Sequence, residues 1–106
     1  MAQKFNTGNF NAEVLQSEEP VLVDFYADWC GPCRMMGPLV EQLADTYNGK
    51  VKVGKVNVDE DGALAGNYGI QSIPSFLLFK NGQVVDSVTG GVPQQVLKQM
   101  IDRQVA

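Results

Sequence analysis

Histidine is absent from this chain of 106 residues. Its absence excludes Cys–His and Ser–His catalysis, because both use an imidazole as the general base. It also leaves zinc with two cysteine ligands, Cys30 and Cys33, whereas structural zinc sites usually have four ligands. The two cysteines lie three positions apart, so the chemistry of the protein must be sought at that pair.

The sequence also has no cluster of Lys and Arg and no long apolar run. Its net charge is −4 and no segment could neutralise a run of phosphates, so we expect no direct binding of nucleic acid. The longest apolar stretches, at 21–23 and 73–79, are far shorter than the roughly 20 residues of a membrane span. Residues 1–5 contain no apolar segment typical of a signal peptide. We therefore expect a soluble cytoplasmic protein with no membrane partner.

Hydrophobic residues make up 44% of the chain, and charged residues of both signs are mixed along it. A chain of this size and composition can bury one core without metals or crosslinks. No internal repeat or second core is visible in the sequence. We therefore predict a single domain over residues 1–106.

Periodicity and turn residues predict nine elements in the order βαβαβαββα. Strands are expected from β-favouring runs at 3–5, 21–27, 51–58, 75–80 and 83–89. The dipeptide Asn81-Gly82 predicts a tight hairpin between the last two strands. In the third strand the apolar phase slips between Val53 and Val56, which indicates burial on both faces or a bulge.

Helices are expected where apolar residues recur at helical spacing. Asn9 can cap the first helix, and Asp61 can cap a short helix that ends at Tyr68. A longer helix is predicted over 32–47, with a kink at Pro38, and Pro93 can begin the last helix. Alternating strands and helices followed by a hairpin imply an α/β fold with a mixed sheet between two layers of helices.

The segment Trp29-Cys30-Gly31-Pro32-Cys33 follows a predicted strand and begins a predicted helix. Backbone N–H groups and the positive end of the helix dipole therefore point at the first sulfur and favour a thiolate at Cys30. The thiolate is the attacking species in disulfide exchange. Two intervening residues let Cys33 reach the mixed disulfide and resolve it. We predict a redox-active pair in which Cys30 attacks and Cys33 releases the client.

Three other interpretations of this pair fit the sequence less well. Half of a zinc site would need two further ligands, which only a second subunit could supply. A purely structural disulfide that closes four residues would stabilise the fold by only roughly 2 kcal/mol. Two buried reduced cysteines would not explain glycine and proline between them at the start of a helix.

Asp24 interrupts an apolar strand that should end close to the cysteines. Burial would raise its pKa and would let it accept the proton of Cys33, directly or through one water. The alternative is an edge position at which Asp24 faces solvent. Lys55, if it lies on the neighbouring strand, could moderate the charge of Asp24, but it is equally well explained as a solvated lysine.

The residues that carry a family resemblance are spread over nearly the whole chain. They include the segment 23–33, Lys55, Tyr68-Gly69-Ile70, Ile73-Pro74, Phe79-Lys80-Asn81-Gly82 and Gly90. In this combination they resemble the thioredoxin family. The resemblance implies a five-stranded mixed sheet flanked by four helices. Proline before a strand already favours a turn or a cis bond at Ile73-Pro74, and the resemblance implies a cis bond lying against the disulfide.

The resemblance also implies roles for individual residues. Cys30 is the nucleophile, Cys33 the resolving thiol, Asp24 the buried acid and base, and Lys55 its neighbour. An extended client segment docks largely through backbone hydrogen bonds, as in strand addition. The groove that receives it is formed by Trp29, Gly31, Pro32, Ile73, Pro74, Gly90 and Gly91.

Four residues depart from the usual family pattern, and none of them is expected to contact a sulfur. Tyr26 stands where thioredoxins often have tryptophan, and Arg34 stands where lysine is common. Gly37 precedes Pro38 and makes the expected kink more flexible. Thr89, before Gly90, is more polar than the usual apolar residue.

The function implied is general protein disulfide reduction by a monomer that binds no cofactor. Thioredoxin reductase would supply electrons from NADPH, and the clients would be of the ribonucleotide reductase, methionine sulfoxide reductase and peroxiredoxin types. A periplasmic oxidant or isomerase on the same fold usually has histidine between the cysteines, where this chain has Gly31 and Pro32. A redox-independent binding subunit of a larger assembly is the alternative from a different class.

Overall fold

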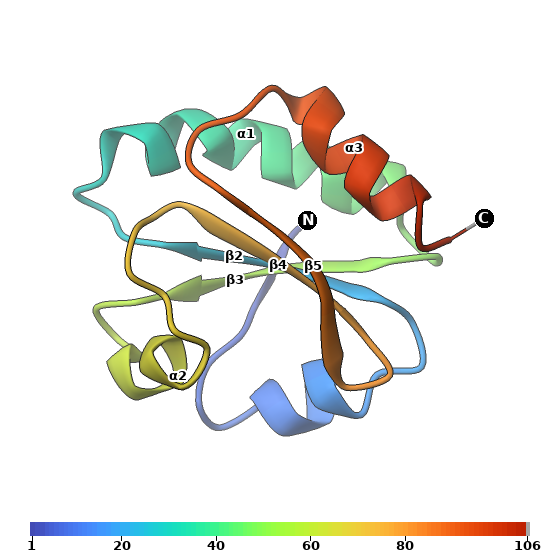
Figure 1. Cartoon of the computed structure of the whole chain (residues 1–106), viewed down its shortest axis with the longest axis horizontal. Coiled ribbons are helices and arrows are strands. Elements are labelled where there is room, and N and C mark those ends of the chain that lie inside the picture. The colour runs from blue at the N-terminus through green and yellow to red at the C-terminus, as the bar shows by residue number, and fades with distance from the viewer. Residues whose placement is uncertain (106) are drawn as a thin grey trace.

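The computed structural model describes residues 1–105, and its centre is a mixed sheet of five strands (Figure 1). The strands are β1 (Gln3–Lys4), β2 (Val21–Tyr26), β3 (Lys52–Asn57), β4 (Ser75–Lys80) and β5 (Gln83–Thr89). Their spatial order is β1-β3-β2-β4-β5. β3 runs parallel to both β1 and β2, whereas β4 is antiparallel to β2 and β5. β2 therefore occupies the middle of the sheet.

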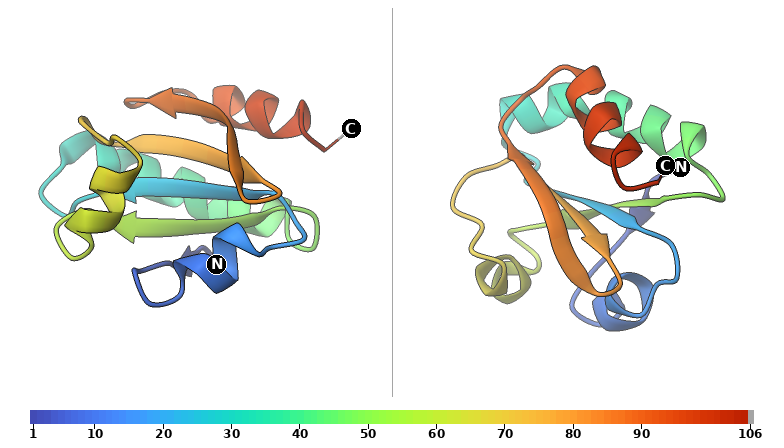
Figure 2. Two further views of the ribbon diagram at one scale, coloured as in Figure 1. Left: turned by 60° about the horizontal axis from the view of Figure 1, so that its bottom comes forward. Right: turned by 45° about the vertical axis from the view of Figure 1, so that its right-hand side comes forward.

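Helices cover both faces of this sheet. They are η1 (Asn11–Leu15), α1 (Gly31–Thr46), α2 (Gly62–Asn67) and α3 (Gln94–Asp102). The right-hand view of Figure 2 shows α1 and α3 together on one side of the sheet and η1 and α2 on the other. The predicted order βαβαβαββα is confirmed, with the difference that the first helix is a π-helix. No helix within residues 1–105 is long and apolar enough to cross a membrane.

The alternation of side chains along β2 and β3 builds a separate core on each face. Leu22 and Val53 pack under α1 and α3 with Val40, Leu97 and other buried side chains. Val23 and Val56 pack on the opposite face with Phe5, Phe10 and Phe79. The slip in apolar phase along β3 thus reflects burial on both faces, and the register of β3 with β2 is continuous.

The hairpin lies where the sequence predicted it. Asn81 and Gly82 both have positive φ, at 53° and 78°, as a tight two-residue hairpin turn requires. A Cβ at position 82 would lie 2.9 Å from the carbonyl oxygen of Leu15, so glycine is required there for space as well. The register between β4 and β5 shifts between Leu78 and Phe79, two residues before the turn.

Two predicted helix caps are wrong. The side chain of Asn9 accepts a hydrogen bond from the N–H of Asn6 and donates to the carbonyl of Lys4, so it closes a turn before η1. Asp61 occupies the N-cap position of α2, but its carboxylate accepts from the N–H and hydroxyl of Thr7 and from no N–H of its own helix. Asn9 thus binds the backbone three and five residues before it, whereas Asp61 binds Thr7, 54 residues away, a contact that local sequence does not specify.

The packing of Gly54 against Phe5 gives the first prediction. An alanine Cβ at position 54 would lie 2.2 Å from the fully buried ring of Phe5, closer than any real contact allows. We expect Gly54→Ala to lower the free energy of unfolding by about 1–3 kcal/mol, the usual effect of overpacking, in urea denaturation. Gly66→Ala in α2 is the matched control, because nothing lies within 4 Å of its Cβ, and it should leave the free energy unchanged or raise it by up to about 1 kcal/mol. Equal free energies for the two variants would contradict this packing.

Candidate active site

The two cysteines lie where the polypeptide leaves β2 and enters α1. Cys30 is the N-cap residue of α1, with extended backbone angles, and its sulfur accepts a hydrogen bond of 3.2 Å from the N–H of Cys33. Pro32 stands in the first turn of the helix, where its missing N–H is not needed. The two sulfurs form a disulfide, and both cysteines are nearly buried. A backbone donor and the positive end of a helix therefore both act on the Cys30 sulfur.

Two other loops meet this helix start. The Ile73-Pro74 peptide bond is cis, and the Cys30 Sγ lies 3.8 Å from the carbonyl oxygen of Ile73. The carbonyl of Pro74 accepts a hydrogen bond of 2.7 Å from the N–H of Gly90, which ties the second loop to the third. These bonds bring two of the predicted groove segments to the disulfide.

Two apolar pockets are lined by residues that flank Cys30 in the chain, one by Pro32 and the other by Trp29. The larger, with a volume of about 370 Å³, is lined by Pro32, Met35, Met36, Leu39, Gly91, Val92 and Pro93. The smaller, with a volume of about 170 Å³, is lined by Trp29, Val58, Ala65, Ile70, Gln71, Ser72 and Ile73. Four of the seven predicted groove residues line one of these two pockets: Trp29, Pro32, Ile73 and Gly91. Pro74 and Gly90 are joined by the backbone hydrogen bond described above, and Gly31 is the first residue of α1.

Sequence reasoning missed two members of this surface. Met35 has an exposed fraction of 79%, unusual for a large apolar side chain, and it lines the larger pocket. The signal that could have found it is an apolar residue of α1 outside the set that the helix buries. Asp59 accepts a hydrogen bond of 2.8 Å from the indole N–H of Trp29, which is itself 68% exposed. This bond fixes the orientation of the indole at the edge of the smaller pocket.

Asp24 lies in the core and not at an edge. It is 1% exposed, and strand alternation places it with Leu22 on the face of β2 that α1 covers. Among residues 1–105, neither carboxyl oxygen has a hydrogen-bond partner. Burial raises the pKa of Asp24 to about 7, although the positive charge of Lys55 opposes the rise. The alternative that Asp24 faces solvent is therefore wrong.

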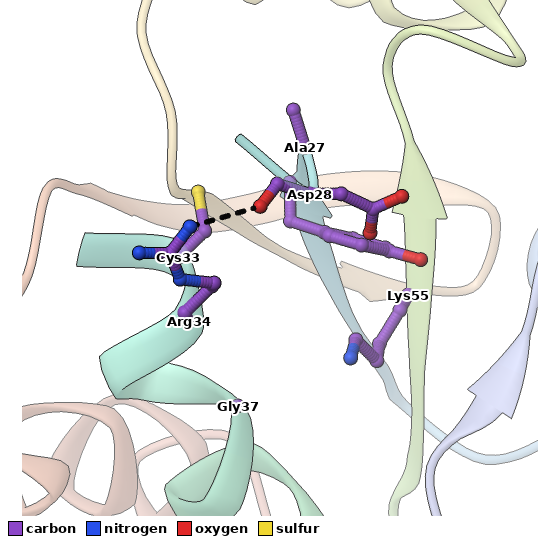
Figure 3. Close-up of a pocket in the computed structure, with 7 residues that line it drawn as sticks. Ala27, Asp28, Cys33, Arg34, Gly37 and Lys55 are labelled. Atoms are coloured by element: carbon purple, nitrogen blue, oxygen red, sulfur yellow. Dashed lines mark hydrogen bonds between the residues drawn. The ribbon is translucent and has the colours of Figure 1, made fainter. Parts of the chain in front are cut away.

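Lys55 lies opposite Asp24 in the register of β2 and β3, so the two residues are neighbours on adjacent strands, as predicted. Its ammonium, however, lies 4.5 Å from the ring centroid of Tyr26. Lys55 lines a pocket of about 330 Å³ that Cys33 also lines (Figure 3). At the rim of this pocket Arg34 donates a hydrogen bond of 3.4 Å to the carbonyl oxygen of Asp28. Cys33 and Lys55 thus border the same open pocket.

The arrangement defines a class of protein. Two residues separate the cysteines of the disulfide at the start of α1, where Cys30 caps the helix and Cys33 lines an open pocket. Such a pair exchanges with the thiols and disulfides of other proteins without a bound cofactor. Within residues 1–105, no cluster of side chains could hold a metal ion. The protein is a thiol–disulfide oxidoreductase whose redox group is its own disulfide.

Comparison with known proteins identifies the family. The family model described as Thioredoxin matches residues 1–103. Thioredoxin from Chlorobaculum thiosulfatiphilum is 52% identical over 97 residues, which cover 92% of this chain and 90% of that protein. Thioredoxin 1 from Nostoc sp. strain PCC 7120 is 50% identical over 104 residues, which cover 98% and 97%. The chain belongs to the thioredoxin family, and the predicted thioredoxin fold is confirmed.

The unusual burial of Asp24 gives a prediction for stability. The native carboxyl keeps its proton up to about pH 7, whereas the unfolded carboxyl loses it near pH 4, so raising the pH between these values lowers the free energy of unfolding. The loss is complete above pH 7 and amounts to about 4 kcal/mol, at about 1.4 kcal/mol for each of about 3 pH units. We expect Asp24→Asn to abolish this loss in urea denaturation at pH 4.5 and pH 8. The same pH dependence in the variant as in the wild type would contradict the burial of a titrating carboxyl.

Proposed function

We propose that the protein is a general protein disulfide reductase. The Cys30 thiolate attacks one sulfur of a client disulfide, which forms a mixed disulfide and expels the other client sulfur as a thiolate. Cys33 then loses its proton and attacks the Cys30 sulfur, which re-forms the internal disulfide and releases the client with both sulfurs reduced. The observation that carries this proposal is the N-cap position of Cys30, whose sulfur accepts the N–H of Cys33.

The client would lie across the three loops that meet at the disulfide. The residues proposed to contact it are Trp29, Gly31, Pro32, Ile73, Pro74, Gly90 and Gly91. Two apolar pockets, one lined by Pro32 and the other by Ile73, support this path, because they can accept side chains of an extended segment without fixing its sequence. Such a surface suits many clients and little sequence specificity.

Asp24 is proposed as the acid and base for Cys33. A carboxyl with a pKa of about 7 is neither fully protonated nor fully ionised at neutral pH, which suits a group that both takes and returns a proton. It lies on the same face of β2 as the core under α1, the helix that carries Cys33. Lys55 is proposed as the neighbour that moderates its charge.

The wider setting follows from the family. Thioredoxins generally work with thioredoxin reductase and disulfide-containing clients, and we propose that NADPH supplies electrons through that reductase. Proposed clients are of the ribonucleotide reductase, methionine sulfoxide reductase and peroxiredoxin types, and the proposed role is redox homeostasis and electron transport in the cytoplasm by a monomer. A relative from Pisum sativum, 48% identical over 103 residues, is a chloroplastic M-type thioredoxin.

Trapping of the mixed disulfide tests the two cysteine roles. In Cys33→Ser the resolving step is absent, so a covalent adduct with a disulfide-containing protein such as insulin should accumulate, and Cys30→Ser should form none. Mass spectrometry under non-reducing conditions measures both adducts. An adduct through Cys33 in Cys30→Ser, formed as fast as the Cys30 adduct, would contradict the assigned roles.

The rate of client release tests the role of Asp24. Asp24→Asn should slow resolution of a preformed mixed disulfide roughly tenfold to a hundredfold at pH 7, since general acid–base catalysis contributes on this scale or above. Stopped-flow fluorescence of Trp29 follows the step. Asp28→Asn is the matched control, because Asp28 lines the pocket beside Cys33 but is exposed. Equal release rates in the two variants would remove Asp24 from the mechanism.

A further inference from the structure

The contact between Lys55 and Tyr26 has no part in the function described so far. The Lys55 ammonium lies 4.5 Å from the Tyr26 ring centroid, within the range of a cation–π interaction. Tyr26 and Lys55 come from adjacent strands, and both line the pocket behind Cys33. The ring is therefore a binding site for the ammonium at the place where the resolving sulfur meets solvent.

Lys55 has a second potential partner in Asp24. The two residues are directly opposite in the register of β2 and β3, where side chains of paired residues leave the sheet on the same face. No ion pair joins them within residues 1–105, and both oxygens of the buried carboxyl lack a hydrogen-bond partner. An available cation thus lies beside an unpaired carboxyl without pairing with it.

The other groups around Asp24 do not explain this arrangement. From α1, Arg34 directs its guanidinium to the carbonyl of Asp28, and Cys33 is held in the disulfide. On β4 the residue opposite Asp24 is Phe76, which does not titrate. From α3 the buried residues are Leu97, Met100 and Ile101, all apolar. Lys55 is therefore the cation whose position decides whether the carboxyl has a counterion.

We propose that Tyr26 is a positioning residue whose ring holds the Lys55 ammonium in the pocket behind Cys33 and so keeps it from pairing with the Asp24 carboxylate. The lysine side chain is long enough to reach either partner, and a cation–π contact on this scale, about 0.5–2 kcal/mol, competes with an ion pair that would require burial of the ammonium. Asp24 then retains its proton near neutral pH, as its proposed role requires. The consequence for the reaction rests on that proposed role.

The test is a double-mutant cycle read by carboxyl carbon NMR of Asp24 in the oxidised protein. Tyr26→Leu should release Lys55 and lower the pKa of Asp24 by about one pH unit, since an opposite charge within 4–6 Å shifts a carboxyl by about this much. Tyr26→Phe keeps the ring and should match the wild type. In a Lys55→Gln background, Tyr26→Leu should have no effect. An unchanged pKa in Tyr26→Leu, or a shift that persists without Lys55, would overturn the proposal.

A second measurement needs no variant at position 26 to fold. An ammonium held over an aromatic ring places its neighbouring Cε protons in the ring current, so these protons of Lys55 should resonate upfield of those of the exposed Lys50 in the wild type. Equal resonances would overturn the contact. The pH profile of client release separates the two proposals: if the Asp24 pKa moves in Tyr26→Leu while the profile does not, the placement of Lys55 stands and the acid–base role of Asp24 fails.

Discussion

The burial of β2 is the constraint on which the site depends. Because β2 lies between β3 and β4, every residue from Val21 to Phe25 is removed from solvent, and this includes the carboxyl of Asp24. The same central position delivers the end of the strand to the start of α1, where Cys30 caps the helix. A strand at the edge would leave Asp24 ionised in water and would separate it from the disulfide. Burial of the Asp24 carboxyl without a hydrogen-bond partner lowers the stability of the fold, and it places a titrating group in the core under the helix that carries the disulfide.

Two opposite electrostatic environments follow within a few residues. The Cys30 sulfur faces backbone N–H and a helix N-terminus, which stabilise negative charge, whereas Asp24 lies in apolar surroundings, which favour its neutral form. The first environment favours the attacking thiolate and the second favours a carboxyl that can exchange a proton near neutral pH. The ring of Tyr26 binds the ammonium of Lys55, the residue that pairs with Asp24 in the register of β2 and β3. In our proposal this contact keeps the surroundings of Asp24 without a paired cation.

Much of this could be predicted from sequence because its signals are local. Asn81 and Gly82 both accept positive φ readily, so this dipeptide alone predicts a hairpin turn. Glycine and proline between two cysteines are typical of the start of a helix. The cap predicted at Asp61 is wrong because its carboxylate binds Thr7, 54 residues away, whereas Asn9 binds backbone groups of Lys4 and Asn6 in the turn before the helix. The contact of Lys55 with Tyr26 and the bond of Asp59 to Trp29 join different loops and strands, and no spacing rule along one element identifies such pairs.

The reduction potential of the Cys30–Cys33 pair tests the central claim most directly. The protein would be equilibrated in glutathione or dithiothreitol buffers, and free thiols would be trapped by alkylation and counted by mass. A reductant should have a potential of about −270 mV, a value taken from thioredoxins in general. A potential above roughly −200 mV would mean that the reduced form is strongly stabilised, as in oxidants and isomerases, and would contradict the account of this protein as a disulfide reductase.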